Sequence, residues 1–240
     1  MTDVAHHQWF IEPREMQRQE SRRGRRHAYE WLDPRRTALV VVDIVPFFAE
    51  ESAYCRGVVP NVNRLAAELR DHGGTVCWVV PGYEAPSDVT REFYGDWVAD
   101  MYAKSGGGGA PRDRLWKELD VDSADVVVEK TAPSAFFPGK CPLHDLLAER
   151  GITTLIVTGT VTNVCVEATV RDASTLDYRV ILVADACAAP RDQDHNATLH
   201  VVYRTFGDVR PTADVLTLID QGIPLGQRPL GFESPVLRQA

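Results

Sequence analysis

The stretch that most constrains this chain is TLIVTGTVTNVCVEATVRDA, residues 154–173. It opens with a short apolar run, residues 155–157, which is typical of a buried strand in a parallel sheet. A turn at Gly159 follows, and possible N-caps for the helix that begins after it are Thr160, Thr162 and Asn163. Cys165 is then expected in the first turn of that helix. Unpaired N–H groups and the positive end of the helix dipole lower the pKa of a thiol there and favour the thiolate.

A cysteine that follows a buried strand is alternatively a small apolar core residue. The ends of two earlier apolar runs favour a chemical role instead. The run TALVVVD ends in Asp43, and the run DVVVEK ends in Lys130. In open α/β sheets, ligands bind outside the carboxyl ends of the strands, where the strand order reverses. Three reactive side chains at three strand ends therefore predict a site at that edge of the sheet.

In these segments the chain resembles the isochorismatase-like cysteine hydrolases. The matching pieces are VVVDIVPFF, VVVEKTAPSAFF and VTGTVTNVCVEATVRDA, and the similarity covers residues 35–220. The family includes nicotinamidases, N-carbamoylsarcosine amidases, ureidoacrylate and biuret hydrolases, and some lactam hydrolases. The resemblance implies that Asp43, Lys130 and Cys165 form a catalytic triad.

Strand-like and helical segments alternate along the chain, which predicts a three-layer α/β/α fold with a parallel sheet. We expect six strands, at residues 37–43, 75–80, 125–130, 154–158, 178–186 and 206–210. The resemblance adds the Rossmann-like strand order 3-2-1-4-5-6, which sets Asp43 and Cys165 side by side. Strand three then lies about 10 Å from strand one, a gap that the long side chain of Lys130 can span.

The length of 240 residues and a hydrophobic content of 44% are those of one globular domain, which we place at residues 37–221. Residues 1–36 are expected to be a polar N-terminal arm with a short helix, packed on the body or on a neighbouring subunit. Residues 222–240 are expected to be an irregular tail. Residues 81–120, rich in aromatics and in glycine, predict an irregular mobile cover over the site, with a disordered surface loop as the alternative.

Charge and cysteine usage narrow the classes of partner. A formal net charge of −8 argues against nucleic-acid binding and is compatible with a neutral or cationic small substrate. Five cysteines without CxxC spacing indicate a reducing compartment rather than a disulfide framework. We find no signal peptide and no apolar run of membrane-spanning length, so we expect a cytoplasmic protein without membrane contact. The resemblance implies a homo-oligomer, either a dimer or a tetramer.

The resemblance also assigns an oxyanion hole to the backbone N–H groups of Val161 and Cys165, with a cis peptide bond between Thr160 and Val161. Nicotinamidases carry a metal site of aspartate and histidines after the first two strands, but residues 44–71 and 73–112 contain no histidine. We therefore assign no metal and no other cofactor. The family usually has glutamine where this chain has Val45, which predicts a different pocket floor.

Other residues carry weaker predictions. Phe48, Phe136 and Asn163 are close to the triad in sequence and either line the pocket or simply pack. His195 and His200 are expected to be surface or packing residues. Asp172 and Asp185 are expected to stabilise turns and helix ends.

Residues and resemblance together predict a metal-independent hydrolase that cleaves an amide, ureido or lactam C–N bond through a covalent acyl-thiol intermediate. Asp43 would take the proton of Cys165 and later protonate the leaving nitrogen, while Lys130 stabilises the thiolate. TNVCVEATVRDA is most similar to ureido and carbamoyl amidohydrolases, and DHNATLHVVYRTFGDVRPTADVL is similar to streptothricin hydrolases, so a lactam stays open. Further alternatives are a vinyl ether hydrolase of the isochorismatase type, which Cys165 argues against, and a non-catalytic binding protein.

Overall fold

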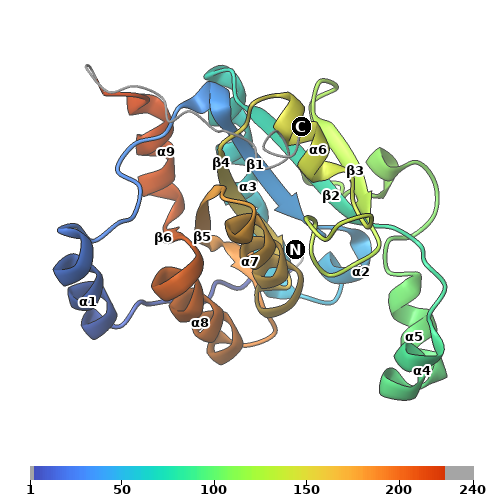
Figure 1. The fold of residues 1–240 in the computed structure, drawn as a ribbon. Coiled ribbons are helices and arrows are strands. Elements are labelled where there is room, and N and C mark those ends of the chain that lie inside the picture. The colour runs from blue at the N-terminus through green and yellow to red at the C-terminus, as the bar shows by residue number, and fades with distance from the viewer. Residues whose placement is uncertain (1–2, 225–240) are drawn as a thin grey trace, which may run out of the picture.

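A six-stranded sheet with helices on both faces forms the body of the protein, as a computed structural model that describes residues 3–224 shows (Figure 1). All of its strand pairs are parallel, and the strand order β3-β2-β1-β4-β5-β6 confirms the expected 3-2-1-4-5-6. The strands are β1 (Thr37–Val42), β2 (Thr75–Pro81), β3 (Val126–Lys130), β4 (Thr154–Thr160), β5 (Arg179–Ala188) and β6 (Asp208–Arg210).

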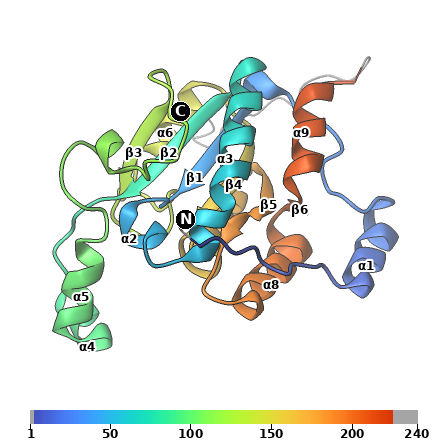
Figure 2. The same cartoon turned by 180° about the vertical axis from the view of Figure 1, so that it is seen from behind.

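The central strands are buried on both faces because helices cover each side of the sheet. Along β1, Leu39 and Val41 belong to one apolar core and Val40 to the other. The first core packs under α3 (Ala53–Asp71) and α9 (Thr212–Gln221), which Figure 2 shows in front of the sheet. The second core packs under α6 (Leu143–Glu149), α7 (Glu167–Thr175) and α8 (Asp192–Val201), in front in Figure 1.

The N-terminal arm lies against the body. It crosses the start of α3, where the N–H of Ala5 donates to the carbonyl of Ala53 at 3.0 Å. A Cβ atom at Gly57 would lie 2.1 Å from the carbonyl oxygen of Ala5, so this close approach requires glycine. The predicted short helix is α1 (Pro13–Arg23), which a left-handed Gly24 ends; a 3-10 turn, η1 (Pro34–Arg36), then leads into β1.

Residues 81–120 are not irregular, and that expectation is wrong. They contain α4 (Asp88–Tyr94), α5 (Asp96–Ala103) and a 3-10 turn, η2 (Pro111–Arg114). Ser87 accepts the N–H of Thr90 and so caps α4, a local signal that the sequence reading overlooked. The pair α4–α5 projects beside the body instead of covering the strand ends (Figure 1).

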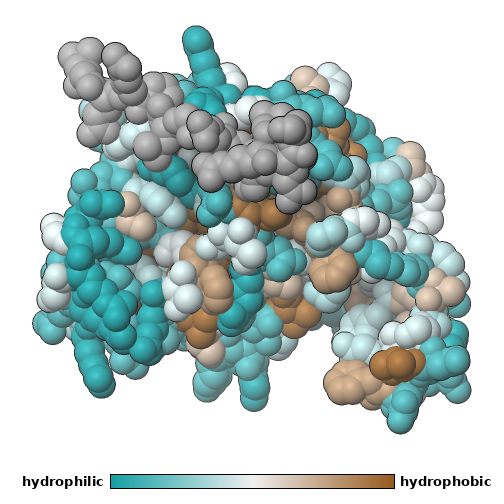
Figure 3. Space-filling model, viewed as in Figure 1, coloured by the Kyte–Doolittle hydropathy of each residue, from teal (hydrophilic) through white to brown (hydrophobic). Residues whose placement is uncertain are grey.

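The surface of the projecting pair carries apolar side chains, which gather at its tip in Figure 3. Val89, Phe93 and Trp97 are each about three-quarters exposed. Within residues 3–224, none of the helices is both long and apolar enough to cross a membrane. The predicted irregular tail, residues 222–240, lies outside the described residues except for its first three positions.

Candidate active site

Three strand ends bring the predicted triad together at one edge of the sheet. Asp43 directly follows β1, Lys130 ends β3, and Cys165 lies in η3 (Thr162–Val166), a π-helical turn that follows β4. Asp43 has a φ of +56°, in the left-handed region that aspartate tolerates better than most residues. Its N–H donates to the carbonyl of Val79 at 2.9 Å, which ties the end of β1 to β2.

Lys130 lies between the other two residues of the triad. Its Nζ is 2.8 Å from Oδ2 of Asp43 and 3.5 Å from Sγ of Cys165, and it donates to the carbonyl of Ala132 at 3.1 Å. Asp43 and Lys130 are buried, with side chains 1% and 4% exposed, whereas Cys165 is partly exposed. One ammonium group thus contacts both the carboxylate and the thiol, and Cys165 is the least buried of the three residues.

Burial is the largest influence on the pKa of each residue of the triad. It raises the pKa of Asp43, although the positive Lys130 opposes the rise. Burial alone would lower the pKa of Lys130, but the negative charge of Asp43 and the contact with Cys165 outweigh it and raise that pKa. Burial and the neighbouring Asp43 raise the pKa of Cys165 to about 12, against the effect of Lys130. These shifts favour a protonated thiol in the resting site, against the expectation of a thiolate favoured by a helix N-terminus.

The turn between β4 and Cys165 depends on close backbone contact. Gly159 has a φ of +115°, and a Cβ atom there would lie 2.1 Å from the carbonyl oxygen of Val42 in β1. The expected cis peptide bond between Thr160 and Val161 is present. Val164 and Val166 both donate their N–H groups to the carbonyl of Val161. Val161 therefore begins the turn that contains Cys165, while the assignment of their N–H groups to an oxyanion hole stays a prediction.

A buried histidine contacts this turn, which the sequence reading did not foresee. His195 is fully buried, and its Nδ1 lies 3.0 Å from Oγ1 of Thr162, the residue that opens η3. The N-terminal arm also contacts His195, because the ring of His7 stacks on its ring. No local pattern signals a contact between side chains so distant in sequence.

The weaker predicted residues separate into different environments. Phe136 is buried in the core against Tyr178, with ring centroids 5.4 Å apart, which favours the packing alternative. Phe48 is partly buried and packs edge-on against Phe47. Asn163 is exposed on the turn that contains Cys165. Asp185 accepts the N–H and the hydroxyl of Thr212, as expected of a residue that stabilises a helix end.

Val45 and the glycine run at residues 106–109 lie in different environments. Val45 is fully buried in the core beneath α2 (Pro46–Ala49). A cavity of about 290 Å³ lies beside Phe47, bounded by residues 104–108 and by Arg114. Gly106 is packed against the carbonyl of Pro81, where a Cβ atom would clash at 1.9 Å, so this end of the glycine run is anchored.

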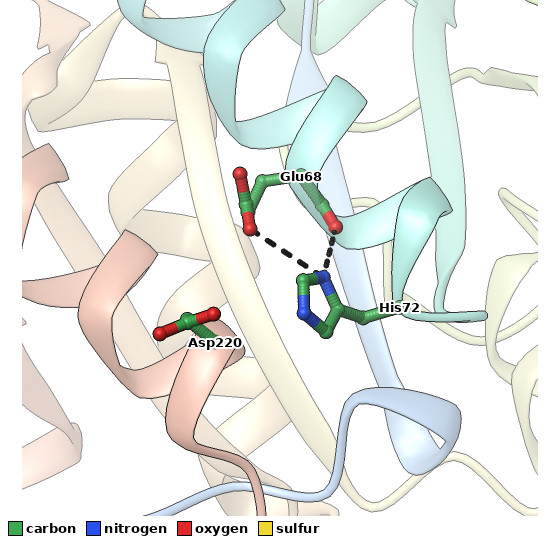
Figure 4. A group of neighbouring side chains, drawn as sticks. All are labelled: Glu68, His72 and Asp220. Atoms are coloured by element: carbon green, nitrogen blue, oxygen red, sulfur yellow. Dashed lines mark hydrogen bonds and ion pairs between the residues drawn. The ribbon is translucent and has the colours of Figure 1, made fainter.

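Within residues 3–224, a group of side chains with metal-ligand chemistry lies at the opposite edge of the sheet (Figure 4). Glu68 and His72 at the end of α3 and Asp220 of α9 place one ligand atom each within 4.8 Å of the others. Nδ1 of His72 is 2.9 Å from the backbone oxygen of Glu68. Because α3 ends where β2 begins, this group is remote from the thiol, and the absence of a catalytic metal stays a prediction.

Comparisons with known proteins agree with this fold. The Isochorismatase domain matches residues 37–214. The uncharacterized isochorismatase family protein YwoC of Bacillus subtilis is 33% identical over 191 residues, covering 77% of this chain and 95% of its own. Ureidoacrylate amidohydrolase RutB of Klebsiella pneumoniae is 30% identical over 190 residues, covering 64% of this chain and 73% of its own. The crystal structure of a cysteine hydrolase from Pseudomonas syringae matches with a TM-score of 0.71 and 28% identity, covering 81% of this chain and 97% of its own.

Proposed function

The chain belongs to the isochorismatase family, and we propose that it is a cysteine-dependent hydrolase that cleaves a non-peptide C–N bond in a small molecule. The observation that carries this proposal is the position of Lys130, with its Nζ 2.8 Å from Asp43 and 3.5 Å from Cys165. A buried carboxylate, a buried ammonium group and the thiol of a partly exposed residue, in contact with one another, are the parts that nucleophilic attack on an amide needs.

The first step is attack by sulfur on the substrate carbonyl. Because the thiol is protonated at rest, Asp43 must accept its proton as the S–C bond forms. The burial that raises the pKa of Asp43 makes it a better base for this transfer. Lys130 keeps its charge and stabilises the developing thiolate. The carbonyl electrons move to oxygen, and the N–H groups of Val161 and Cys165 are the proposed donors to that oxyanion.

The second step breaks the C–N bond. Protonated Asp43 returns its proton to the leaving nitrogen, the carbonyl re-forms, and an acyl group remains on Cys165. Water then attacks this acyl group while Asp43 takes one of its protons. The C–S bond breaks, the acid product leaves, and Asp43 returns the proton to sulfur, which restores the resting thiol.

A linear ureido or carbamoyl amide is the substrate class that we propose first. It is supported by the 30% identity to a protein named ureidoacrylate amidohydrolase. The net charge of −8 is compatible with a neutral or cationic substrate. The ureido carbon is attacked in the same way as an amide carbon, so the proposed steps apply to it unchanged.

The test is turnover of a panel of carbamoyl amino acids, ureidoacrylate, biuret, nicotinamide and a streptothricin-type lactam. Wild type is compared with Cys165→Ala, and intact mass detects the acyl adduct. Cys141→Ala is the matched control because Cys141 is the other partly exposed cysteine within residues 3–224. We expect turnover of a ureido substrate by wild type and by Cys141→Ala but not by Cys165→Ala. Turnover that persists in Cys165→Ala would rule out the thiol mechanism.

A further inference from the structure

A hydrogen bond ties α8 to the turn that contains Cys165. Oγ1 of Thr162 lies 3.0 Å from Nδ1 of His195, and both side chains are completely buried. Thr162 directly follows Val161 and precedes Cys165 by three positions, so it lies between the two proposed oxyanion donors. The orientation of the peptide that joins Val161 to Thr162 is therefore held, through one hydroxyl, by a residue 33 positions away.

The N-terminal arm completes this support. The ring of His7 stacks between His195 and Tyr54 of α3, with centroids 4.2 and 4.0 Å away and planes inclined by 10° and 4°. Nδ1 of His7 is 2.7 Å from Oδ1 of Asp192, and Nε2 accepts the N–H of Ala189 at 3.0 Å. Because Nε2 is an acceptor, the proton of the neutral ring is on Nδ1, and both of its nitrogens are engaged.

The charge on His195 is fixed by the groups around it. Burial and the neighbouring His7 lower its pKa to about 3, and the backbone of Ala184 in β5 and the carboxylate of Asp192 in α8 oppose this only in part. The imidazole is neutral at any pH at which an amidohydrolase would work. Its contact with Thr162 therefore does not change with protonation over that range.

We infer that His195, acting through Thr162, is a positioning residue for the turn that contains Cys165, and that His7 of the arm completes its support. The inference rests on the proposed function, because it assumes that Val161 and Cys165 donate to an oxyanion. Such donors act only within a few tenths of an ångström of the right place, and a misplacement of about 1 Å costs about 100-fold in rate. The arm is then part of the functional unit, although it contacts no reacting atom.

The competing explanation is that His195 only fills space in the core. Thr162→Val separates the two explanations because valine keeps the shape and removes the hydroxyl. Thr162→Ser is the matched control, because serine keeps the hydroxyl. His7→Phe tests the arm independently: phenylalanine keeps a ring for stacking but loses the contacts with Asp192 and Ala189.

The experiment measures kcat, KM and Tm for each variant, and the rate at which iodoacetamide alkylates Cys165, with Cys165→Ala as background. We expect Thr162→Val to lose about 10-fold or more in kcat with KM within about twofold, and Thr162→Ser to recover most of the loss. His7→Phe should also have a lower kcat than wild type. The Thr162→Val and His7→Phe thiols should be alkylated at least about threefold more slowly than the wild-type thiol, because the turn sets the distance of sulfur from Lys130.

Alkylation needs no substrate, so it tests the inference even if the panel yields no turnover and the proposed function fails. Wild-type values of kcat and alkylation in a folded Thr162→Val protein would overturn the role of the hydroxyl. If Thr162→Val does not fold, His7→Phe decides: unchanged alkylation and kcat in that variant would overturn the inference. An equal loss in Thr162→Val and Thr162→Ser would overturn it as well, because then shape alone matters.

Discussion

Acid should destabilise this protein well above the pKa of its carboxylates, because His195 is buried in the neutral form. In the unfolded chain His195 titrates with a pKa of about 6.5, whereas in the folded protein its pKa is about 3. Below pH 6.5 the unfolded state therefore binds a proton that the folded state does not. The contribution is complete above about pH 6.5 and is lost as the pH falls toward 3.

The size of this effect follows from the two pKa values. Between them, each pH unit costs about 1.4 kcal/mol of unfolding free energy. Going from pH 7 to pH 5 should cost about 2 kcal/mol, which for a protein of this length lowers Tm by about 4–8 °C. Carboxylates whose pKa is lowered stay out of this window, and Asp43, whose pKa burial raises, is common to all three proteins compared below. The Asp194 and Glu84 carboxyls, whose pKa is lowered by hydrogen bonds from Arg191 and Lys140, lose their contribution only below about pH 4.5.

The assay is Tm by calorimetry at half-unit steps from pH 7 to pH 5 for three proteins. Wild type and the control His200→Asn should show the same fall in Tm. His195→Asn removes the titrating group, so its Tm should start lower but decline by less than half as much. The slopes are compared, and not the absolute values, because the variant also loses the contact with Thr162. A His195→Asn protein with the wild-type slope would refute the reasoning.

Three further outcomes concern the triad and the turn beside it. Since the pKa of Cys165 is about 12, its alkylation rate should rise nearly tenfold per unit from pH 7 to pH 10, and a plateau below pH 9 would contradict the raised pKa. Lys130→Met leaves Asp43 without its buried partner and should cost about 3–5 kcal/mol in urea unfolding. A loss under 1 kcal/mol would show that this ion pair adds little. Gly159→Ala places a methyl group 2.1 Å from the Val42 oxygen and should cost about 3 kcal/mol or more, detected as a lower urea midpoint; an unchanged midpoint would mean that the turn can move.

Much of the fold could be predicted from the sequence, because a strand that is buried on both faces appears there as a short apolar run. The run of β1 is apolar at every position after Thr37, and all six of its residues are buried. The ends of such runs, Asp43 and Lys130, mark one edge of a parallel sheet whatever the helices do. The strand order came from the resemblance to a family, and its confirmation explains why three side chains distant in sequence meet.

Composition and sequence position alone did not predict the helices within residues 81–120 or the burial of individual side chains. Residues 81–120 looked irregular by composition, yet Ser87 before α4 is an ordinary helix cap. Phe136 and Phe137 are adjacent and chemically identical, but Phe136 is buried and Phe137 is about half exposed. Neighbouring side chains in an irregular segment point in different directions, and only the packed backbone decides which one faces the core.

The sequence by itself determined the residue types available for chemistry and the strand ends at which they lie. Only the tertiary structure decided their protonation. A thiol near a helix start has a low pKa if water reaches it, but the pKa of Cys165 is raised because its neighbours exclude water and Asp43 adds negative charge. The contact of His7 with His195 is likewise a product of folding, because the two residues are far apart in the sequence. Desolvation of a side chain depends on the residues that pack around it, and those residues come together only when the chain folds.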